Sequence, residues 1–229
     1  YPDGKGTYYD AVKGYKILKK HGVETAVSFT IGSHNVNHIK EYLKHLVNEL
    51  HPSGIGMNFL LDTNQGSNPF SVDISYATDK AIEGFKYLRE KGIYEDRMMR
   101  KIRPFTSGRI HLKDCGAPGK QLVLAPNGDM GVCQAFLPSR EFYPLNINED
   151  ANPSYNRLVG EWNHRYPLEM DECISCEALG ICGGGCPYQS YINTGSIWNL
   201  DERMCIHNKK FIKWLMWDIY DNQKEDKMG

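Results

Sequence analysis

Seven cysteines carry the clearest chemistry in this 229-residue sequence. All of them lie in the second half of the chain, at Cys115, Cys133, Cys173, Cys176, Cys182, Cys186 and Cys205. Secreted disulfide scaffolds are usually much shorter chains with an even number of cysteines, so an odd and clustered set favours metal ligation in a reducing compartment. The cysteines therefore predict a metal-binding protein of the cytoplasm.

The run Cys173-x2-Cys176-x5-Cys182-x3-Cys186-Pro187 has the spacing of iron–sulfur ligands. In two-cluster ferredoxins, the last cysteine of a related Cys-x3-Cys-Pro run ligates the other cluster. The same logic separates Cys186 from the cysteines before it. One cluster is then expected to take Cys173, Cys176, Cys182 and Cys205. The second is expected to take Cys115, Cys133 and Cys186.

Glycines surround this run, at Gly180, Gly183, Gly184 and Gly185. They allow the backbone to pass close to inorganic sulfide, where N–H groups can donate hydrogen bonds that raise the reduction potential. A structural zinc site is the alternative, but zinc ribbons usually show two Cys-x2-Cys knuckles and this sequence has one. A zinc-binding module and a non-catalytic iron–sulfur electron carrier both stay open on these residues.

The composition is that of an ordinary globular protein, with 41% hydrophobic and 24% charged residues and a formal net charge of −1. Such a balance gives no electrostatic footprint for nucleic acid or an anionic membrane. No apolar run approaches the roughly 20 residues that span a bilayer. We therefore expect neither nucleic acid nor a membrane as a partner.

Hydrophobic periodicity predicts an α/β pattern before the cysteines. Helices are expected at about 7–20, with Thr7 as N-cap, at 39–50 and at 74–91. Strands are expected at 23–31 and 55–61. This alternation is typical of a parallel βα barrel or a doubly wound sheet. Two strands cannot close a barrel, so we expect the other strands to be missing from this chain.

From about residue 103 the helical periodicity disappears and glycine, proline and cysteine become frequent. A β-hairpin is expected over 121–134, with Asn127-Gly128 supplying the positive φ angles of its turn. A loop-rich segment follows, and the last element is a helix at about 207–221. The predicted domains are therefore 1–102 and 103–229.

The full spacing Cys115-x12-Gly128-x4-Cys133, followed by the four-cysteine run and Cys205, resembles the seven-cysteine signature of the SPASM domain. The segment before it, with "YDAVKGYKILKKHG" and "VETAVSFTI", is similar to the second half of the radical SAM barrel. The resemblance implies a partial (β/α)6 barrel followed by a small loop-rich α+β domain with a β-hairpin and a C-terminal helix. It also implies two auxiliary [4Fe–4S] clusters: Cys115, Cys133 and Cys186 would hold the first, and Cys173, Cys176, Cys182 and Cys205 the second.

The family likeness further implies SAM and a third [4Fe–4S] cluster in the intact enzyme. The Cys-x3-Cys-x2-Cys motif for that cluster is absent here, so this chain alone is expected to be inactive. Expected partners are a peptide or protein substrate, the missing N-terminal half of the barrel, and a reductant such as flavodoxin or ferredoxin. The resemblance places SAM contacts near Ser28 and at Asn35 or Asn37, although these residues suit turn and N-cap chemistry equally well.

The residue after Cys133 bears on the reaction. Anaerobic sulfatase-maturing enzymes carry an aspartate base at this position, where the present sequence has Gln134, an amide that cannot take a proton. The resemblance therefore favours a maturase that installs a thioether or another radical-derived crosslink in a ribosomally made peptide. Sulfatase maturation is the disfavoured alternative.

Overall fold

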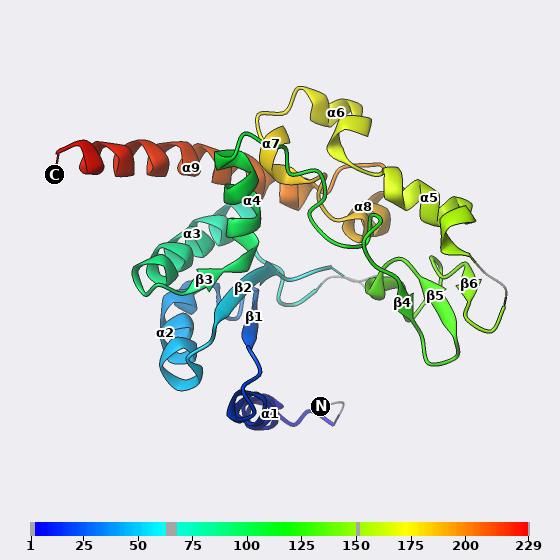
Figure 1. The fold of residues 1–229 in the computed structure, drawn as a ribbon, viewed down its shortest axis with the longest axis horizontal. Helices are drawn as coiled ribbons and strands as arrows, with labels where there is room; N and C mark the ends of the chain where they lie inside the picture. Colours follow the sequence, from blue (N-terminus) through cyan, green and yellow to red (C-terminus); the bar gives the residue numbers. More distant parts are fainter. Residues whose placement is uncertain (1–2, 63–67, 150–151, 229) are drawn as a thin grey trace. The chain divides into compact units, whose positions relative to one another are not determined.

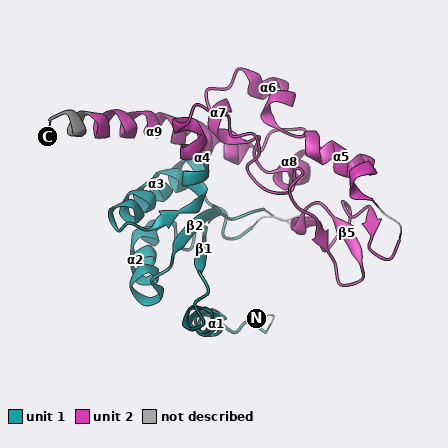
Figure 2. Ribbon diagram, in the orientation of Figure 1, with its two compact units in different colours: residues 1–100 teal, residues 101–229 magenta. Residues whose placement is uncertain are grey.

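The computed structural model describes residues 3–62, 68–149 and 152–228 (Figure 1). The chain folds into two compact units, residues 1–100 (unit 1) and 101–229 (unit 2), which Figure 2 shows in different colours. Each unit has its own sheet and its own buried residues. The units are described separately below.

Unit 1 is built on a parallel sheet, as the alternation of helices and strands predicts. Its strands β1 (Ala26–Ile31), β2 (Gly54–Phe59) and β3 (Tyr94–Glu95) lie in the order β1-β2-β3. β1 pairs with β2 along its whole length, and Gly54 of β2 is in register with Tyr94 of β3. The strand β3 was not predicted, because a strand of two residues is too short to show an alternating pattern in the sequence.

Helices α2 (Ile39–Leu50) and α3 (Ile74–Glu90) form at the predicted positions, and a 3-10 turn, η1 (Val36–His38), leads into α2. The two helices lie side by side on one face of the sheet (Figure 1). Gly84 of α3 marks the closest approach, because a Cβ there would lie 2.9 Å from Leu43 of α2 and 3.1 Å from Met57 of β2. The buried core of unit 1 therefore lies between the sheet and these two helices.

Helix α1 (Tyr8–Lys20) also forms, but none of its residues is buried. Thr7 is its N-cap residue, as predicted, but the Thr7 side chain makes no capping hydrogen bond. Tyr9 is 85% exposed, and Ile17 and Leu18 are about half exposed. Unit 1 thus presents an apolar helix surface that its described residues leave uncovered.

Helix α4 (Asp96–Thr106) runs across the boundary between the units, so helical structure continues beyond residue 103, where we expected it to end. The predicted hairpin is present as β4 (Val123–Leu124) and β5 (Asp129–Gly131), and β6 (Leu145–Asn146) extends it to an antiparallel sheet. In the turn, Gly128 has φ +91° whereas Asn127 does not have a positive φ. One left-handed residue is therefore enough for this connection.

The cysteine segment is less irregular than expected. It contains the short helices α5 (Arg157–His164), α6 (Asp171–Ile174), α7 (Leu179–Cys182) and α8 (Pro187–Thr194), together with the 3-10 turns η3 (Pro153–Tyr155) and η4 (Pro167–Glu169). The last helix, α9 (Glu202–Met228), begins earlier than predicted and includes Cys205. Helices of four to eight residues show little periodicity, which explains why the pattern missed them.

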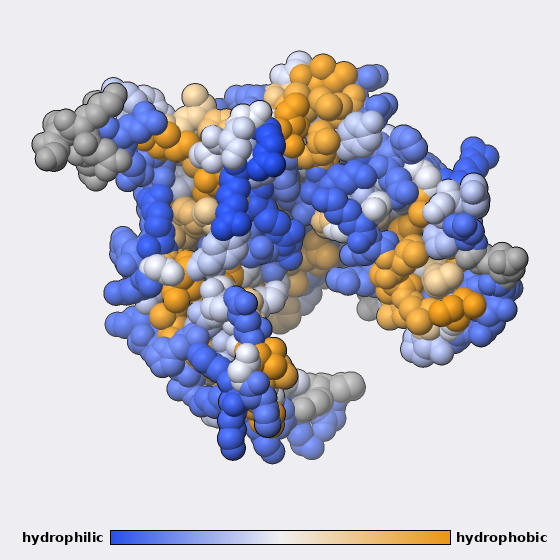
Figure 3. All heavy atoms as spheres, viewed as in Figure 1, coloured by the Kyte–Doolittle hydropathy of each residue, from blue (hydrophilic) through white to orange (hydrophobic). Residues whose placement is uncertain are grey.

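Aromatic side chains form the core of unit 2. Phe136 and Trp162 are at most 1% exposed, and their rings meet edge to face with centroids 6.2 Å apart. On the outside, Leu124 and Ile147 are each 57% exposed, and hydrophobic atoms gather on the surface over the β4–β5 sheet (Figure 3). Among the described helices, none combines the length and the apolar character that crossing a membrane requires.

Candidate metal centres

The cysteines lie on separate elements of unit 2, and every one is a free thiol. Cys133 precedes the 3-10 turn η2 (Gln134–Phe136), Cys173 lies in α6, and Cys182 ends α7. Cys186 is the N-cap of α8, and Cys205 lies in the first turn of α9. The helix ends therefore fix most of the sulfur positions.

Three of the thiols are electrostatic neighbours: Cys115, Cys133 and Cys186, called here the three-thiol group. Burial, with a contribution from the charge of Cys186, raises the pKa of Cys133 to about 11. Burial likewise raises the pKa of Cys186 to about 11, with contributions from Asp201 and Cys115. The pKa of Cys115 is raised by burial and, to a smaller extent, by Asp114 and Cys133.

The other thiols interact in the same way: Cys173, Cys176, Cys182 and Cys205, called here the four-thiol group. Burial is the main cause that raises the pKa of Cys205 to about 12, and the charges of Cys182 and Cys173 add to this shift. Burial also raises the pKa of Cys173, with smaller contributions from the charges of Cys182 and Cys176. These mutual electrostatic effects agree with the two sets that the spacing predicts, and both the grouping and the ligation of metal stay predictions.

The raised pKa values have a chemical consequence. The thiolate is the metal ligand, so loading either group must release protons from thiols that burial holds in their neutral form. Within the described residues, no three His, Cys, Asp or Glu side chains close around a single metal ion. The donor set of each group is nonetheless the one that iron–sulfur clusters use, thiol sulfur with nearby backbone N–H groups.

A glycine triplet at 183–185 joins the two groups, because it is the whole connection between Cys182 and Cys186. All three glycines have positive φ, at +71°, +80° and +69°. Burial raises the pKa of Cys182, and the backbone N–H of Gly184 is among the groups that lower it. The predicted N–H donation from glycine to a ligand sulfur is therefore available in this loop.

The triplet also lies against two other elements. A Cβ at Gly183 would come within 2.5 Å of the backbone nitrogen of Asp114, next to Cys115 in the chain. A Cβ at Gly185 would lie 2.9 Å from the Cβ of Asp201, whose carboxylate accepts a hydrogen bond from the backbone N–H of Cys186 at 3.2 Å. Only glycine fits these approaches.

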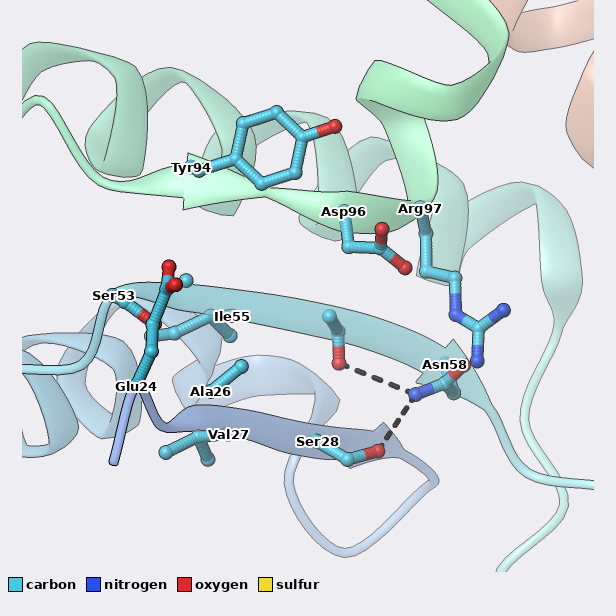
Figure 4. Close-up of a pocket in the computed structure, with 12 residues that line it drawn as sticks. Glu24, Ala26, Val27, Ser28, Ser53, Ile55, Asn58, Tyr94, Asp96 and Arg97 are labelled. Atoms are coloured by element: carbon cyan, nitrogen blue, oxygen red, sulfur yellow. Dashed lines mark hydrogen bonds between the residues drawn. The ribbon is translucent and has the colours of Figure 1, made fainter. Parts of the chain in front are cut away.

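Unit 1 holds a separate hollow of about 390 Å³ on the face of its sheet opposite α2 and α3 (Figure 4). The predicted SAM contact Ser28 lies in its wall, where the side-chain amide of Asn58 donates to the Ser28 hydroxyl at 2.9 Å and to the carbonyl of Gly56 at 3.2 Å. Asp96 and Arg97 line the same hollow. Its described lining contains no cysteine.

The two asparagines lie elsewhere. Asn35 is 8% exposed and its amide is engaged in the turn after β1, accepting from the backbone N–H of Gly32 at 3.0 Å and donating to the carbonyl of Thr30 at 2.8 Å. Asn37 is exposed and accepts from the hydroxyl of Tyr76 at 2.6 Å. Neither lines the hollow. The hydrogen bonds of the turn account for Asn35, and SAM contacts at Ser28, Asn35 or Asn37 stay predictions.

No protein-family model matches the chain. The antilisterial bacteriocin subtilosin biosynthesis protein AlbA of Bacillus subtilis is 26% identical over 185 residues, which is 79% of this chain and 40% of AlbA. The radical SAM cyclopropyl synthase TigE of Paramaledivibacter caminithermalis is 25% identical over 224 residues, 93% of this chain and 45% of TigE. The chain spans less than half the length of these relatives.

Two solved structures share the fold. The histidine-tagged anSMEcpe with bound AdoMet matches 95% of this chain and 62% of its own with a TM-score of 0.74 at 15% identity. Streptococcus suis SuiB bound to S-adenosylmethionine matches 85% of this chain and 48% of its own with a TM-score of 0.54 at 16% identity. The chain is a relative of the radical SAM/SPASM maturases. Its fold is the mixed α/β fold of radical SAM enzymes.

The sequence pattern of this chain did not reveal that Arg165 is buried. Arg165 is 0% exposed and donates to the carbonyl of Gly184 at 2.9 Å and to the hydroxyl of Ser190 at 3.1 Å. It follows α5 directly, a short helix that periodicity did not reveal. An arginine among polar residues carries no sign in the sequence that the fold will bury it.

An ion pair with a buried lysine lies near the four-thiol group of this chain. The Lys101 ammonium is 2.7 Å from the Asp114 carboxylate, and the lysine side chain is 4% exposed. Burial would raise the pKa of Asp114, but Lys101 and His111 hold it far below its ordinary value. The amide of Asn208 also donates to the sulfur of Cys182 at 3.2 Å. None of these roles was visible in the sequence.

Proposed function

We propose that this chain is the auxiliary-cluster portion of a radical SAM/SPASM maturase, with a partial (β/α)6 barrel in unit 1. Its three-thiol group would hold one [4Fe–4S] cluster and its four-thiol group a second. Such clusters supply one-electron transfer. The complete enzyme would use SAM and a third cluster, held outside this chain, to take hydrogen from a bound peptide and form a thioether or another crosslink.

The observation that carries the proposal is the glycine triplet with three positive φ angles, which separates Cys182 at the end of α7 from Cys186 at the start of α8. The mutual electrostatic effects of the thiols support the division into two sets. The relatives support the substrate class, since AlbA is named for the biosynthesis of a bacteriocin and TigE as a radical SAM synthase. A three-thiol group would leave one iron without a cysteine, open to a substrate group or to a non-cysteine ligand.

Gln134 supports a peptide crosslinking reaction over sulfatase maturation. It begins the 3-10 turn directly after Cys133, and its side chain is exposed. An amide cannot act as the base that the sulfatase-maturing enzymes place at this position. The likeness to anSMEcpe, at 15% identity, concerns the fold alone.

Metal analysis with cysteine variants tests the proposal. The protein is purified without oxygen and its iron, acid-labile sulfide and zinc are counted; we expect about eight iron atoms per chain. Cys133→Ala and Cys176→Ala should each remove about four. The matched control is Ser175→Ala, an exposed residue between Cys173 and Cys176, which should remove none.

Double variants then test the grouping. Cys133→Ala combined with Cys186→Ala should lose no more iron than either single change, because both thiols belong to the three-thiol group. Cys133→Ala combined with Cys176→Ala should lose all of it. A colourless protein that contains zinc in place of iron would refute the cofactor assignment. Iron without any peptide crosslinking by the complete enzyme would favour an electron carrier.

A further inference from the structure

Arg165 is a buried cation whose hydrogen-bond acceptors are all uncharged. Its guanidinium donates to the carbonyls of Gly184 at 2.9 Å and Asn199 at 3.3 Å, to the hydroxyl of Ser190 at 3.1 Å, and to the carbonyl of Ile197. Within the described residues, no carboxylate forms an ion pair with it. A buried charge is costly unless an opposite charge compensates it.

The hydrogen bonds tie this guanidinium to both thiol groups. Gly184 belongs to the glycine triplet that connects Cys182 of the four-thiol group with Cys186 of the three-thiol group. The hydroxyl of Ser190, which accepts from Arg165, donates in turn to the carbonyl of Cys186 at 3.1 Å. A Cβ at Gly184 would lie 3.4 Å from the guanidinium, so the loop packs directly on it.

The charges that favour the protonated arginine are those of the proposed ligands. Burial lowers the pKa of Arg165, and the charges at Cys186, Asp201, Cys115 and Cys173 oppose that shift. The Asp201 carboxylate has its own cation, because it lies 3.3 Å from the guanidinium of Arg203. Once the clusters are bound, the ligand thiolates of both groups would be the counter-charge left for Arg165.

We infer that Arg165 is a shared counter-ion for the two auxiliary clusters and sets the reduction potential of both. This inference rests on the proposed function. A cluster becomes more negative when it accepts an electron, so a fixed cation nearby favours its reduced state. The hydrogen bonds through Ser190 lead from Arg165 to Cys186 of the three-thiol group, so we expect the larger effect on that cluster. Arg165 acts as a positioning residue through the clusters and touches no substrate.

The test is an anaerobic redox titration, followed by electron paramagnetic resonance, of the cluster-loaded protein. Arg165→Gln keeps an amide donor and removes the charge, whereas Arg165→Lys keeps the charge. At an effective dielectric constant of about 20, a unit charge within about 10 Å changes an equilibrium roughly tenfold. We expect Arg165→Gln to lower the one-electron reduction constant of the three-thiol cluster about tenfold, about 59 mV, with a smaller shift in the four-thiol cluster.

Two controls frame the result. Arg165→Lys should stay close to the parent protein, and so should Arg157→Gln, which removes an exposed arginine from the start of α5. Iron and sulfide are counted on the parent protein first. If the parent protein holds no clusters, the proposed function is refuted, and this result is distinct from a failure of the role of Arg165. Full iron content in Arg165→Gln with unchanged potentials would overturn the counter-ion role.

The remaining outcomes are also decisive. If Arg165→Gln has the circular dichroism of a folded protein but loads neither cluster, while Arg165→Lys loads both, the charge is required and the inference is supported. If Arg165→Gln does not fold, the arginine is a structural residue and the inference fails.

Discussion

Replacing Gly183 by alanine tests the geometry on which both candidate clusters depend. Gly183 has φ +71°, and a Cβ there would lie 2.5 Å from the backbone nitrogen of Asp114 and 2.9 Å from the carbonyl carbon of Lys113. These atoms belong to the backbone and cannot swing away as the end of a side chain could. The substitution must therefore move the loop or the segment that carries Cys115.

Two terms contribute to the expected loss of stability. A left-handed conformation costs an L-residue about 1–2 kcal/mol, part of which is offset because alanine restricts the unfolded chain. Forcing a methyl group into occupied space costs about 1–3 kcal/mol more. Gly195 isolates the first term, because it has φ +77° and nothing lies within 4 Å of its Cβ position.

The assay compares Gly183→Ala with Gly195→Ala by urea unfolding and by iron content after anaerobic purification. We expect Gly195→Ala to lose about 1 kcal/mol and no iron. Gly183→Ala should lose about 1–3 kcal/mol beyond that, a urea midpoint lower by roughly 0.5–1.5 M, together with part of its iron. Equal losses in the two variants would refute the close approach of the glycine triplet to Asp114.

Three further changes probe buried groups in urea titrations. Lys101→Met should cost about 1–3 kcal/mol because it removes the nearer cationic partner of the half-buried Asp114 carboxylate and leaves His111 at 3.8 Å, whereas Lys213→Met, at an exposed pair, should cost at most about 1 kcal/mol. Glu95→Gln should cost about 1–3 kcal/mol, because both oxygens of Glu95 accept buried backbone N–H groups. Burial raises the pKa of Glu95 above its ordinary value, so the stabilisation by the protonated side chain is present below the unfolded pKa and is lost as pH rises through the folded pKa. The difference in stability from Glu95→Gln should therefore shrink as pH rises above the ordinary pKa of a glutamate. Gly84→Ala should destabilise by about 1–3 kcal/mol through its 2.9 Å approach to α2, whereas Gly14→Ala, in open space, should stabilise by about 0.5–1 kcal/mol.

Each of these has a result that contradicts it. Equal effects at Lys101 and Lys213 would mean that the Lys101 pair is accessible to water. A difference between Glu95 and its glutamine variant that grows with pH would reverse the sign of the shift. Stabilisation by Gly84→Ala would show that α3 does not pack closely on α2.

The regular elements of unit 1 could be predicted from the sequence because their causes are local. Ile39, Leu43 and Leu50 recur at helical spacing, and all three are buried in α2. The parallel pairing of β1 with β2 followed from the helix between them, since parallel strands need such a crossover. The hairpin around Gly128 was signalled by its turn residue.

The spacing of the cysteines predicts two sets of thiols, because chain length limits which sulfurs can reach one site. Cys173 and Cys176, separated by two residues on the short helix α6 and the turn after it, can only be neighbours. The predicted ligation itself awaits metal analysis. The sequence thus supplies the candidate donor atoms and a prediction of their two sets.

Tertiary structure alone decided the surroundings of those donors. Arg165, Lys101 and Asn208 come from elements far apart in the chain, and nothing in their local sequence distinguishes them from exposed residues. The approach of Gly183 to Asp114 joins positions 69 residues apart (183 minus 114). Charge burial and backbone contact of this kind depend on how the elements pack, and sequence periodicity reports only which face of each element is apolar.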